Sequence, residues 1–584
     1  MPPPPSTASN ALTNGLRDTP PWAREAAFLL LLGAVAIALR WPSFGTNGFH
    51  NEDAAGITYN ADLLARGLVP LKDDVEFKGP GAFYLVWAFW SVFGRSITVL
   101  TKVVAFWSVG VTVAVYLTGR VMFGWRAAAV AATLYTILSP TTDSIDINYH
   151  AWMALPYVGA TALFVAGLKR GRSGSFVASG LVLGIAALIK HQSIVLAPLF
   201  GGVILLWPFL ERPEGWAAPR RFAPLACMAV GGVSAFAGLG VYYFTRDGLE
   251  AYFRTYFMAE AGWHYVKGTM AWNDKALRLF EGVWGLWEFL ALPTVLMVAA
   301  VFATVRSRGL KRRPSLLGVL LAGHFVMSFV GASIGFRYFK SYYLQVLPAA
   351  VWLAALPEGP VTRMLSPGFF RAPAAVWKRR ALPGLLVAAF ALPALASDLG
   401  DLRQIRQERR VARDSEAQKL GKIIRENSQP GDRVWVWGRW AWPVYYHADR
   451  VAGTPYYKVL ELLTTTLTNT WRRPTENVRF RADGPWREVI DDLKRVKPAF
   501  IAVSHNEDYH EFKALVDLLA HEYVVVPDTG TRTLTLYRRK DVKLAKPPVP
   551  PAPRRPVPPK MPIKPPAKAP PKTPAAPATA AAKP

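Results

Sequence analysis

Residues 51–93 read NEDAAGITYNADLLARGLVPLKDDVEFKGPGAFYLVWAFWSVF and come soon after the first long apolar run of the chain. The stretch holds six acidic residues and a Lys-Gly-Pro-Gly turn at 78–81, and an apolar segment follows the turn. Acidic side chains beside a bilayer carry a free-energy cost, so they are usually retained for a function. The stretch therefore predicts a site at a membrane surface.

The composition around this stretch is typical of a polytopic membrane protein. Of the 584 residues, 52% are hydrophobic and 18% are charged, a combination that is rare in soluble domains. Apolar runs of roughly 17–25 residues are long enough to cross a bilayer. Clear candidates are 25–41, 99–119, 126–141, 151–168, 222–244, 284–305, 315–333 and 382–398. Weaker candidates at 175–189, 192–210 and 341–356 bring the prediction to about eleven crossings.

The net charge of +28 does not indicate nucleic-acid binding, because the basic residues are distributed as in a membrane protein. Five basic clusters each lie between two apolar runs, at every second gap, as cytoplasmic loops do under the positive-inside rule. Because Arg17 and Arg24 precede the first span, the N-terminus is predicted to be cytoplasmic. The clusters are Arg120/Arg126, Lys169/Arg170/Arg172, Arg212/Arg220/Arg221, Arg306/Arg308/Lys311/Arg312/Arg313 and Lys378/Arg379/Arg380.

This orientation divides the chain into regions. Residues 1–22 are expected to form a disordered cytoplasmic N-terminus, and 541–584 a disordered Pro/Ala/Lys-rich tail. Between them we expect a transmembrane domain at 23–398, with an outer loop at 42–98, and an outer α/β domain at 399–540. The apolar segment after the Lys-Gly-Pro-Gly turn is short for a span and is interpreted as a membrane-surface helix. The Pro/Ala-rich tails and the lack of a targeting signal suggest a multi-pass protein of a bacterial inner membrane. The C-terminal domain would then be periplasmic.

The outer domain has its own pattern. Residues 401–424 are expected to form a charged, exposed helix. Four short strands follow in PGDRVWVWG, PAFIAVS, HEYVVVPD and RTLTLYRR, with helices expected at 486–495 and 508–520, which predicts a small α/β domain. The Trp-rich strand at 435–442 could face an acceptor glycan or pack against the membrane domain, and packing and acceptor positioning are favoured over chemistry. The single cysteine, Cys227, excludes a disulfide framework.

Three separated places in the chain resemble one family, the GT-C fold glycosyltransferases that use polyprenyl- or dolichyl-phosphate sugars. This group includes the protein O-mannosyltransferases of glycosyltransferase family 39 and the bacterial lipid A aminoarabinose transferases. RYFKSYYLQVLPAAVWLAA at 337–355 is similar to a late helix of the bacterial members, and QPGDRVWVWGRWAWPVYYHADRVAGTPYY at 429–457 looks like the start of their outer domain. In the first loop the matching positions are Asp53, Gly67, Asp73, Glu76, Lys78, Pro80 and Gly81.

The chain departs from the pattern of this family at three positions. Glu52 precedes Asp53 where relatives often carry Asp-Glu, and His150 stands where an acidic residue is common. Ser341 stands where a His is common. These differences bear on any metal or acceptor contact carried over from the family.

The resemblance implies an inverting transfer, in which a carboxylate deprotonates an acceptor hydroxyl and cations stabilise the departing phosphate. It assigns Asp53 as the base, with Glu52 as the second choice. Asp is also a good N-cap, so Asp53 could instead begin the helix that follows it.

Several further residues are candidates for binding the substrates. Lys190, Arg337 and Lys340 lie outside the cytoplasmic clusters and suit phosphate binding, although each could instead reach toward lipid headgroups. Lys78 could contribute to phosphate binding, or could pair with Asp73, Asp74 or Glu76, itself a candidate from the matched motif. Asp146 and His150, with Asp143, could hold acceptor contacts.

Together with Asp53, these last three residues could also form a divalent-metal site, but a hydrogen-bonded loop is favoured because none has the spacing of a local metal motif. No cofactor is certain. The expected partners are a polyprenyl-phosphate sugar, a glycan, lipid or protein acceptor, and membrane lipids. A transporter or flippase of a lipid-linked solute is the alternative function, and a non-catalytic scaffold is a third.

Overall fold

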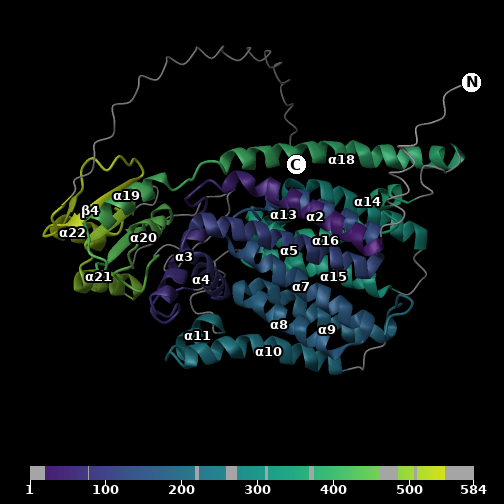
Figure 1. Ribbon diagram of the computed structural model, residues 1–584, viewed down its shortest axis with the longest axis horizontal. Coiled ribbons are helices and arrows are strands. Elements are labelled where there is room, and N and C mark those ends of the chain that lie inside the picture. Colours follow the sequence, from purple (N-terminus) through teal and green to yellow (C-terminus); the bar gives the residue numbers. More distant parts are fainter. Residues whose placement is uncertain are drawn as a thin grey trace, which may run out of the picture.

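The computed structural model describes residues 20–76, 78–217, 222–257, 272–308, 314–366, 374–458, 484–505 and 509–545. A body of packed helices carries a small sheet domain at one end, and helix α18 runs along one edge of the body (Figure 1). Most of the predicted tail at 541–584 and of the predicted N-terminal segment at 1–22 lies outside the described residues, but Pro21 and Trp22 already belong to helix α2 (Pro21–Arg40).

Within these ranges, six helical segments are long and apolar enough to cross a membrane, or seven if a bent pair is counted as one span. The six comprise α2 (Pro21–Arg40, continued to Ser43), α5 (Ile97–Phe123), α7 (Tyr149–Arg170), η3–α9–η4 (His191–Phe209, with α9 at Leu196–Leu206), α10 (Ala223–Phe244) and α15 (Leu316–Ser333). Shorter helices in the body are α6 (Trp125–Leu138), α8 (Ser173–Ile189), α11 (Leu249–Tyr256), α16 (Tyr343–Ala354) and α17 (Pro360–Met364). The larger prediction of about eleven crossings stays a prediction.

The predicted span 284–305 is not one continuous helix, because the chain bends by 97° within it. Helix α13 (Trp272–Phe289) ends there and α14 (Ala291–Arg308) begins. Pro293 in the first turn of α14 lacks the amide N–H that a continuous helix would use, so the helix breaks ahead of it. The carboxylate of Asp398, on α18 (Ala374–Glu408), accepts a hydrogen bond from the amide of Leu292 at 3.4 Å.

The predicted exposed helix at 401–424 is also wrong as a single element. Helix α18 ends at Glu408, and α19 (Ser415–Glu426) starts after a break. The break turns Arg409 and Asp414 inward, where they pair with Asp146 and His447 at 2.9 and 2.7 Å. A continuous helix would keep both side chains on its solvent-exposed turns.

Helices α8 and α10 touch through backbone rather than side chains. A Cβ atom at Gly180 would lie 2.1 Å from the carbonyl oxygen of Met228, and one at Gly231 would lie 2.0 Å from that of Val177. Small residues at such contacts allow the close approach by which helices associate in lipid. The end of α8 is thereby fixed, and Lys190 follows directly after it.

The sheet domain has four strands in the order β1-β2-β4-β3. Strand β1 (Val434–Trp437) pairs parallel with β2 (Phe500–Ser504), while β4 (Leu534–Arg539) pairs antiparallel with β2 and with β3 (Tyr523–Val525). Helices α20 (Pro443–Ala448), α21 (Pro485–Val496) and α22 (Lys513–Glu522) complete it. The predicted α/β domain is confirmed. Trp435 and Trp437 are buried in the core of the sheet domain itself, whereas packing against the membrane domain was expected.

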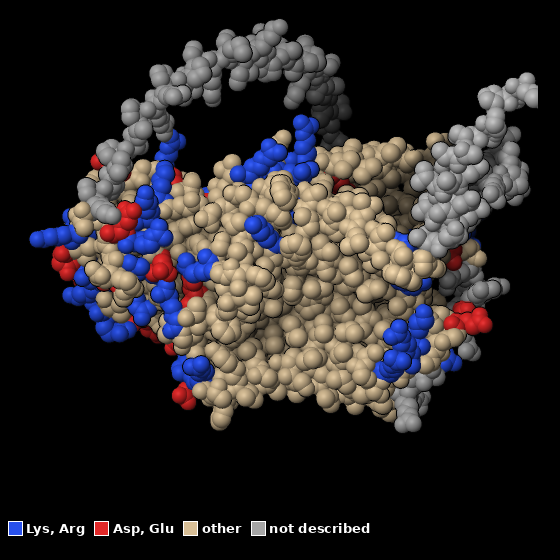
Figure 2. All heavy atoms as spheres, in the orientation of Figure 1, with Lys and Arg blue, Asp and Glu red and all other residues tan. Residues whose placement is uncertain are grey.

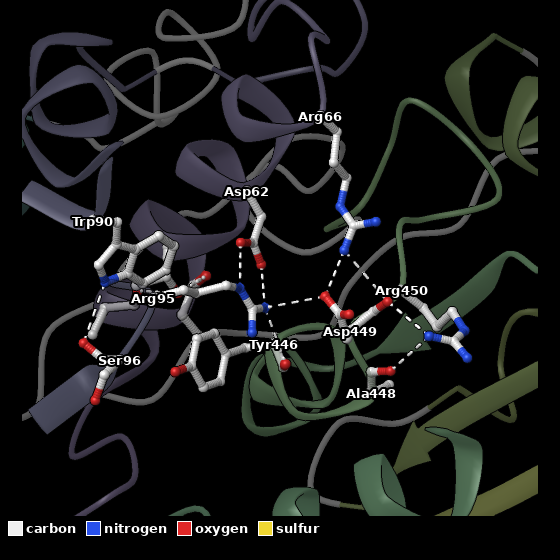
Figure 3. A network of polar contacts seen from close by, with 12 residues as sticks. Asp62, Arg66, Trp90, Arg95, Ser96, Tyr446, Ala448, Asp449 and Arg450 are labelled. Carbon is white, nitrogen blue, oxygen red and sulfur yellow. Dashed lines mark hydrogen bonds and ion pairs between the residues drawn. The ribbon is translucent and has the colours of Figure 1, made fainter. Parts of the chain in front are cut away.

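The acidic loop joins the two parts. Its helices α3 (Glu52–Ala65) and α4 (Gly81–Phe93) lie between the helical body and the sheet domain (Figure 1). Arg95, after α4, holds the Asp62 carboxylate at 2.6 and 2.5 Å and donates to the Tyr446 carbonyl, while Arg66 binds Asp449 of the sheet domain at 2.6 Å (Figure 3). Nearly all of α3 is buried, so it is an internal element.

The charges follow this division. Figure 2 shows Lys, Arg, Asp and Glu gathered on the sheet domain and at the opposite end of the body, with few charged side chains on the face between them. An uncharged band flanked by charged ends is the surface that a protein presents to a bilayer. With its apolar helices, the chain is a membrane protein.

Candidate active site

Asp53 lies in the first turn of α3 but is not the residue that caps it. The side chain of Asn51 accepts the amide of Ala54 at 2.8 Å and performs that role. The Asp53 carboxylate pairs instead with the ammonium group of Lys78. The Asp53 side chain stays 44% exposed, so a substrate can reach it. Glu52 precedes it in the same helical turn.

The Lys-Gly-Pro-Gly turn brings Lys78 to the end of α8. A Cβ atom at Gly79 would lie 2.3 Å from the carbonyl oxygen of Leu188, and one at Gly81 would lie 2.9 Å from the amide nitrogen of Ile189. Only glycine permits such close contact between backbones. The motif therefore seats Lys78 against the segment from which Lys190 emerges.

His150 lies close enough to both lysines for their charges to act on it. It is 2% exposed, its ring packs on Tyr342 with 4.6 Å between centroids, and neither ring nitrogen has a hydrogen-bond partner among the described residues. Lys190 places its ammonium 4.7 Å from the Tyr342 ring centroid, and Lys78 lies 5.1 Å from that of Tyr149. The charges of both lysines act on the His150 ring.

We call this group the cationic cluster. It comprises Asp53, Lys78, Tyr149, His150, Lys190 and Tyr342. Four segments that are distant in sequence meet in it: α3 and its following turn, the start of α7, the end of α8, and η5 (Lys340–Tyr342). Two ammonium groups and an imidazole beside an accessible carboxylate suit an anionic leaving group and a proton acceptor.

The loop between α6 and α7 borders the cluster and is tied to the outer part of α18. Asp146 binds Arg409 at 2.9 Å, and both side chains are largely buried. Burial opposes ionisation, but Arg409 outweighs it and holds the pKa of Asp146 below its usual range. Asp143 lies 3.9 Å from Lys340. These contacts agree with the hydrogen-bonded loop that was favoured over a metal site.

The remaining candidates are more deeply placed. Arg337 is 3% exposed. Glu76 has no exposed side-chain area and accepts from the Lys458 ammonium at 2.7 and 2.5 Å and from the Tyr457 hydroxyl at 2.5 Å. In this conformation Glu76 supports the junction with the sheet domain. Asp73 and Asp74 accept the backbone amides of Val69 and Leu71, so they stabilise the loop.

A divalent metal does not fit the described part of the chain as a resident ion. No three His, Cys, Asp or Glu residues there come together in a group that could hold one. The Asp146 carboxylate is paired with Arg409, and the charges of two lysines act on the His150 ring. We therefore derive no step through a metal.

The aromatic residues of 242–257 divide between two environments. Tyr243, Tyr252 and Tyr256 are buried with Val69 and Leu71, and they hold the acidic loop rather than forming a lipid-facing belt. The Tyr243 hydroxyl donates to the Pro70 carbonyl at 2.9 Å. Other aromatic side chains of the run are exposed: Phe244, Phe253 and Phe257.

Sequence reasoning missed Arg409, Lys458, Tyr149 and Tyr342. Arg409 lies in a run of charged residues that has no mark to separate it from its exposed neighbours. Lys458 directly follows the GTPYY segment, and Tyr342 lies inside the 337–355 resemblance, so position in a matched motif was the available signal for both.

Comparisons with known proteins bear on the family and the fold. Residues 77–231 match the family described as dolichyl-phosphate-mannose-protein mannosyltransferase. A search of curated proteins gave no match. The ArnT structure from Cupriavidus metallidurans bound to undecaprenyl phosphate is similar, with 16% identity, a TM-score of 0.54 and coverage of 88% of this chain and 98% of that one.

The oligosaccharyltransferase AglB of Archaeoglobus fulgidus, in complex with an inhibitory peptide and a dolichol-phosphate, is similar at 15% identity and a TM-score of 0.50. That match covers 89% of this chain and 75% of that one. The expected fold, a polytopic helical GT-C body with a small C-terminal sheet domain, is confirmed.

Proposed function

From the premise that this chain is a GT-C fold glycosyltransferase of the polyprenyl-phosphate-sugar class, we propose that it transfers the donor's sugar with inversion to an acceptor hydroxyl. The family match over 77–231 and the shared fold support the premise. The acceptor is a lipid, a polysaccharide or a protein at the outer face of a bacterial inner membrane.

The observation that carries the proposal is the pairing of Asp53 with Lys78 at the edge of the cationic cluster. An exposed carboxylate, two lysines and a buried imidazole meet where the acidic loop touches the ends of two helices. A scaffold has no need for such a cluster. A transporter would carry charged residues along a path through the membrane. It would not require an exposed carboxylate paired with a lysine at the surface of a loop.

The chemistry follows from this arrangement. Asp53 accepts the proton of the acceptor hydroxyl as its oxygen attacks the anomeric carbon. The bond between that carbon and the phosphate oxygen breaks, and the electron pair leaves with the polyprenyl phosphate. Lys78 and Lys190 stabilise the charge that develops on the phosphate, because fixed cations in a partly dry site act more strongly than in water.

Other candidates take supporting roles in the proposal. Arg337 and Lys340 stay candidates for binding the phosphate in this proposal, and His150 can donate a ring N–H to a phosphate oxygen. Asp146 is a positioning residue, since Arg409 fixes it and it holds the loop that leads into α7. Glu52 is the second choice for the base.

The test uses the full-length protein in lipid with a panel of radiolabelled polyprenyl-phosphate sugars and crude cell envelope as acceptor. We expect wild type to consume one donor and Asp53→Asn to be slower by roughly 100- to 10,000-fold, the usual contribution of a general base. Asp528→Asn is the matched control, because Asp528 is an exposed carboxylate of the sheet domain.

The outcomes separate the hypotheses. Equal consumption by wild type and Asp53→Asn would remove Asp53 as the base while keeping the enzyme. Failure to consume any donor, with movement of a lipid-linked solute across the bilayer instead, would favour the transporter. Product analysis by NMR decides the stereochemistry, since retention at the anomeric carbon would exclude a single displacement.

A further inference from the structure

A hollow lies near the cationic cluster, next to Lys340. It has a volume of about 530 Å³, between the last turns of α13, the residue Lys340, and the outer part of α18. Pockets of roughly 300–1,000 Å³ are the usual size for small-molecule sites. The cavity is separate from Asp53, Lys78 and Lys190, which do not line it.

Its lining combines aromatic and acidic side chains. Trp284 and Trp287 come from α13 and are 53% and 43% exposed. Glu288 lies beside them, and Asp401 and Glu408 face the same space from α18. Indole faces pack on the C–H surface of a sugar ring, and carboxylates accept hydrogen bonds from its hydroxyl groups.

The charge of the cavity selects among ligands. It is lined by three carboxylates and one ammonium group, that of Lys340, which also lies 3.9 Å from Asp143. One of the carboxylates, Glu408, also pairs with Arg413 at 2.8 Å, so Glu288 and Asp401 supply most of the negative charge. An acidic cavity on a chain of net charge +28 repels phosphate, so an anionic lipid headgroup or the donor phosphate is disfavoured. The carboxylates belong to no metal-holding group among the described residues. A neutral or amine-bearing saccharide fits both the indoles and the charge.

The walls are fixed by contacts outside the cavity. The Tyr343 hydroxyl donates to the Gly282 carbonyl at 2.7 Å, and Tyr343 packs on Phe289 with 5.1 Å between ring centroids. Asp398 ties α18 to the start of α14 through the amide of Leu292. These contacts tie α13 to α16, and α18 to the start of α14.

We propose that this cavity binds a saccharide unit of the acceptor, without phosphate, which rests on the proposed glycosyl transfer. Short element η5 joins it to the reaction site, because Lys340 lines the cavity and Tyr342 belongs to the cationic cluster. An acceptor held here is a glycan or glycolipid, rather than an unmodified peptide.

The test is photo-crosslinking of the full-length protein in phosphatidylcholine nanodiscs with a diazirine-bearing glucosamine disaccharide, followed by peptide mapping. We expect label on peptides that contain 284–289 or 397–408. Trp287→Ala should lower that label roughly tenfold, the loss expected for one aromatic contact. Trp125→Ala is the matched control, since Trp125 is 50% exposed at another site. Asp401→Asn, which keeps the side-chain size, should also weaken labelling.

Equal labelling of wild type, Trp287→Ala and Asp401→Asn would overturn the proposal. If phosphatidylglycerol abolishes the label and excess disaccharide does not restore it, the cavity binds a lipid headgroup. That result would also overturn the proposal. Labelling needs neither donor nor turnover, so this outcome is independent of whether the protein consumes a polyprenyl-phosphate sugar.

Discussion

Asp74 shows how one residue of the acidic loop shapes its pH response. The residue is 2% exposed, one carboxylate oxygen accepts the amide of Leu71 at 2.8 Å, and the other has no hydrogen-bond partner among the described residues. Burial, with a further contribution from the nearby charge of Glu76, raises the pKa of Asp74 to about 8. The carboxyl is therefore largely protonated at neutral pH.

This raised pKa makes stability depend on pH. The ordinary pKa of Asp is about 3.9, so the folded protein binds more protons than the unfolded chain between about pH 4 and pH 8. The free energy of unfolding accordingly falls as the pH rises through that window and levels off above it. Asp74→Asn keeps an acceptor for Leu71 and cannot ionise, so it should be more stable than wild type at pH 9. The gain should shrink toward pH 5.

Thermal unfolding at both pH values measures this effect. Asp528→Asn, at an exposed position, serves as the control and should show no such pH-dependent gain. A gain for Asp74→Asn that is larger at pH 5 than at pH 9 would contradict the assignment of the buried, protonated carboxyl.

At the scale of elements, α10 offers a matched pair of glycines. A Cβ atom at Gly231 would lie 2.0 Å from the Val177 carbonyl oxygen of α8, whereas Gly238 has no heavy atom within 4 Å of such a position. We expect Gly231→Val to force the helices apart and destabilise by about 1–3 kcal/mol or more, the cost of overpacking. Gly238→Val should be nearly neutral. Thermal unfolding in nanodiscs compares the two, and equal losses would show that helix propensity rather than contact decides.

The elements that were predicted well from sequence share one property. Their own sequence is enough to predict them, through the length of an apolar run or the alternation of a strand. Examples are the spans 99–119 and 315–333 and the strands of the sheet domain. The break at 409–414 depends on a contact with a distant residue, Asp146, which no local pattern shows. The bend at Leu290 had a local signal in Pro293, but its tie to Asp398 is a contact between distant residues. The site divides in the same way: Asp53 and Lys78 stand in a motif, whereas Arg409 is defined only by its partner.

At the scale of the whole molecule, the acidic loop is held from both sides. The helical body contacts it through the Gly79 and Gly81 turn, and the sheet domain through Lys458, Tyr457 and the Arg95 network. The Tyr59 and Tyr457 rings stack with 4.3 Å between centroids. The position of Asp53 therefore depends on the sheet domain, although that domain contributes no residue to the cationic cluster.

The buried pair of Glu76 and Lys458 tests this dependence. Lys458→Met leaves the Glu76 carboxylate buried without its ammonium partner, and breaking such a pair typically costs about 3–5 kcal/mol. The double variant Glu76→Gln with Lys458→Met has no buried charge there and should recover much of the loss. Lys513→Met, at an exposed position, is the control.

Thermal unfolding and donor consumption are measured together. If the sheet domain positions the loop, Lys458→Met lowers both, while a double variant that recovers stability but not turnover would show that the ion pair also sets the geometry around Asp53. Unchanged stability in Lys458→Met would instead show that the two parts are held together elsewhere.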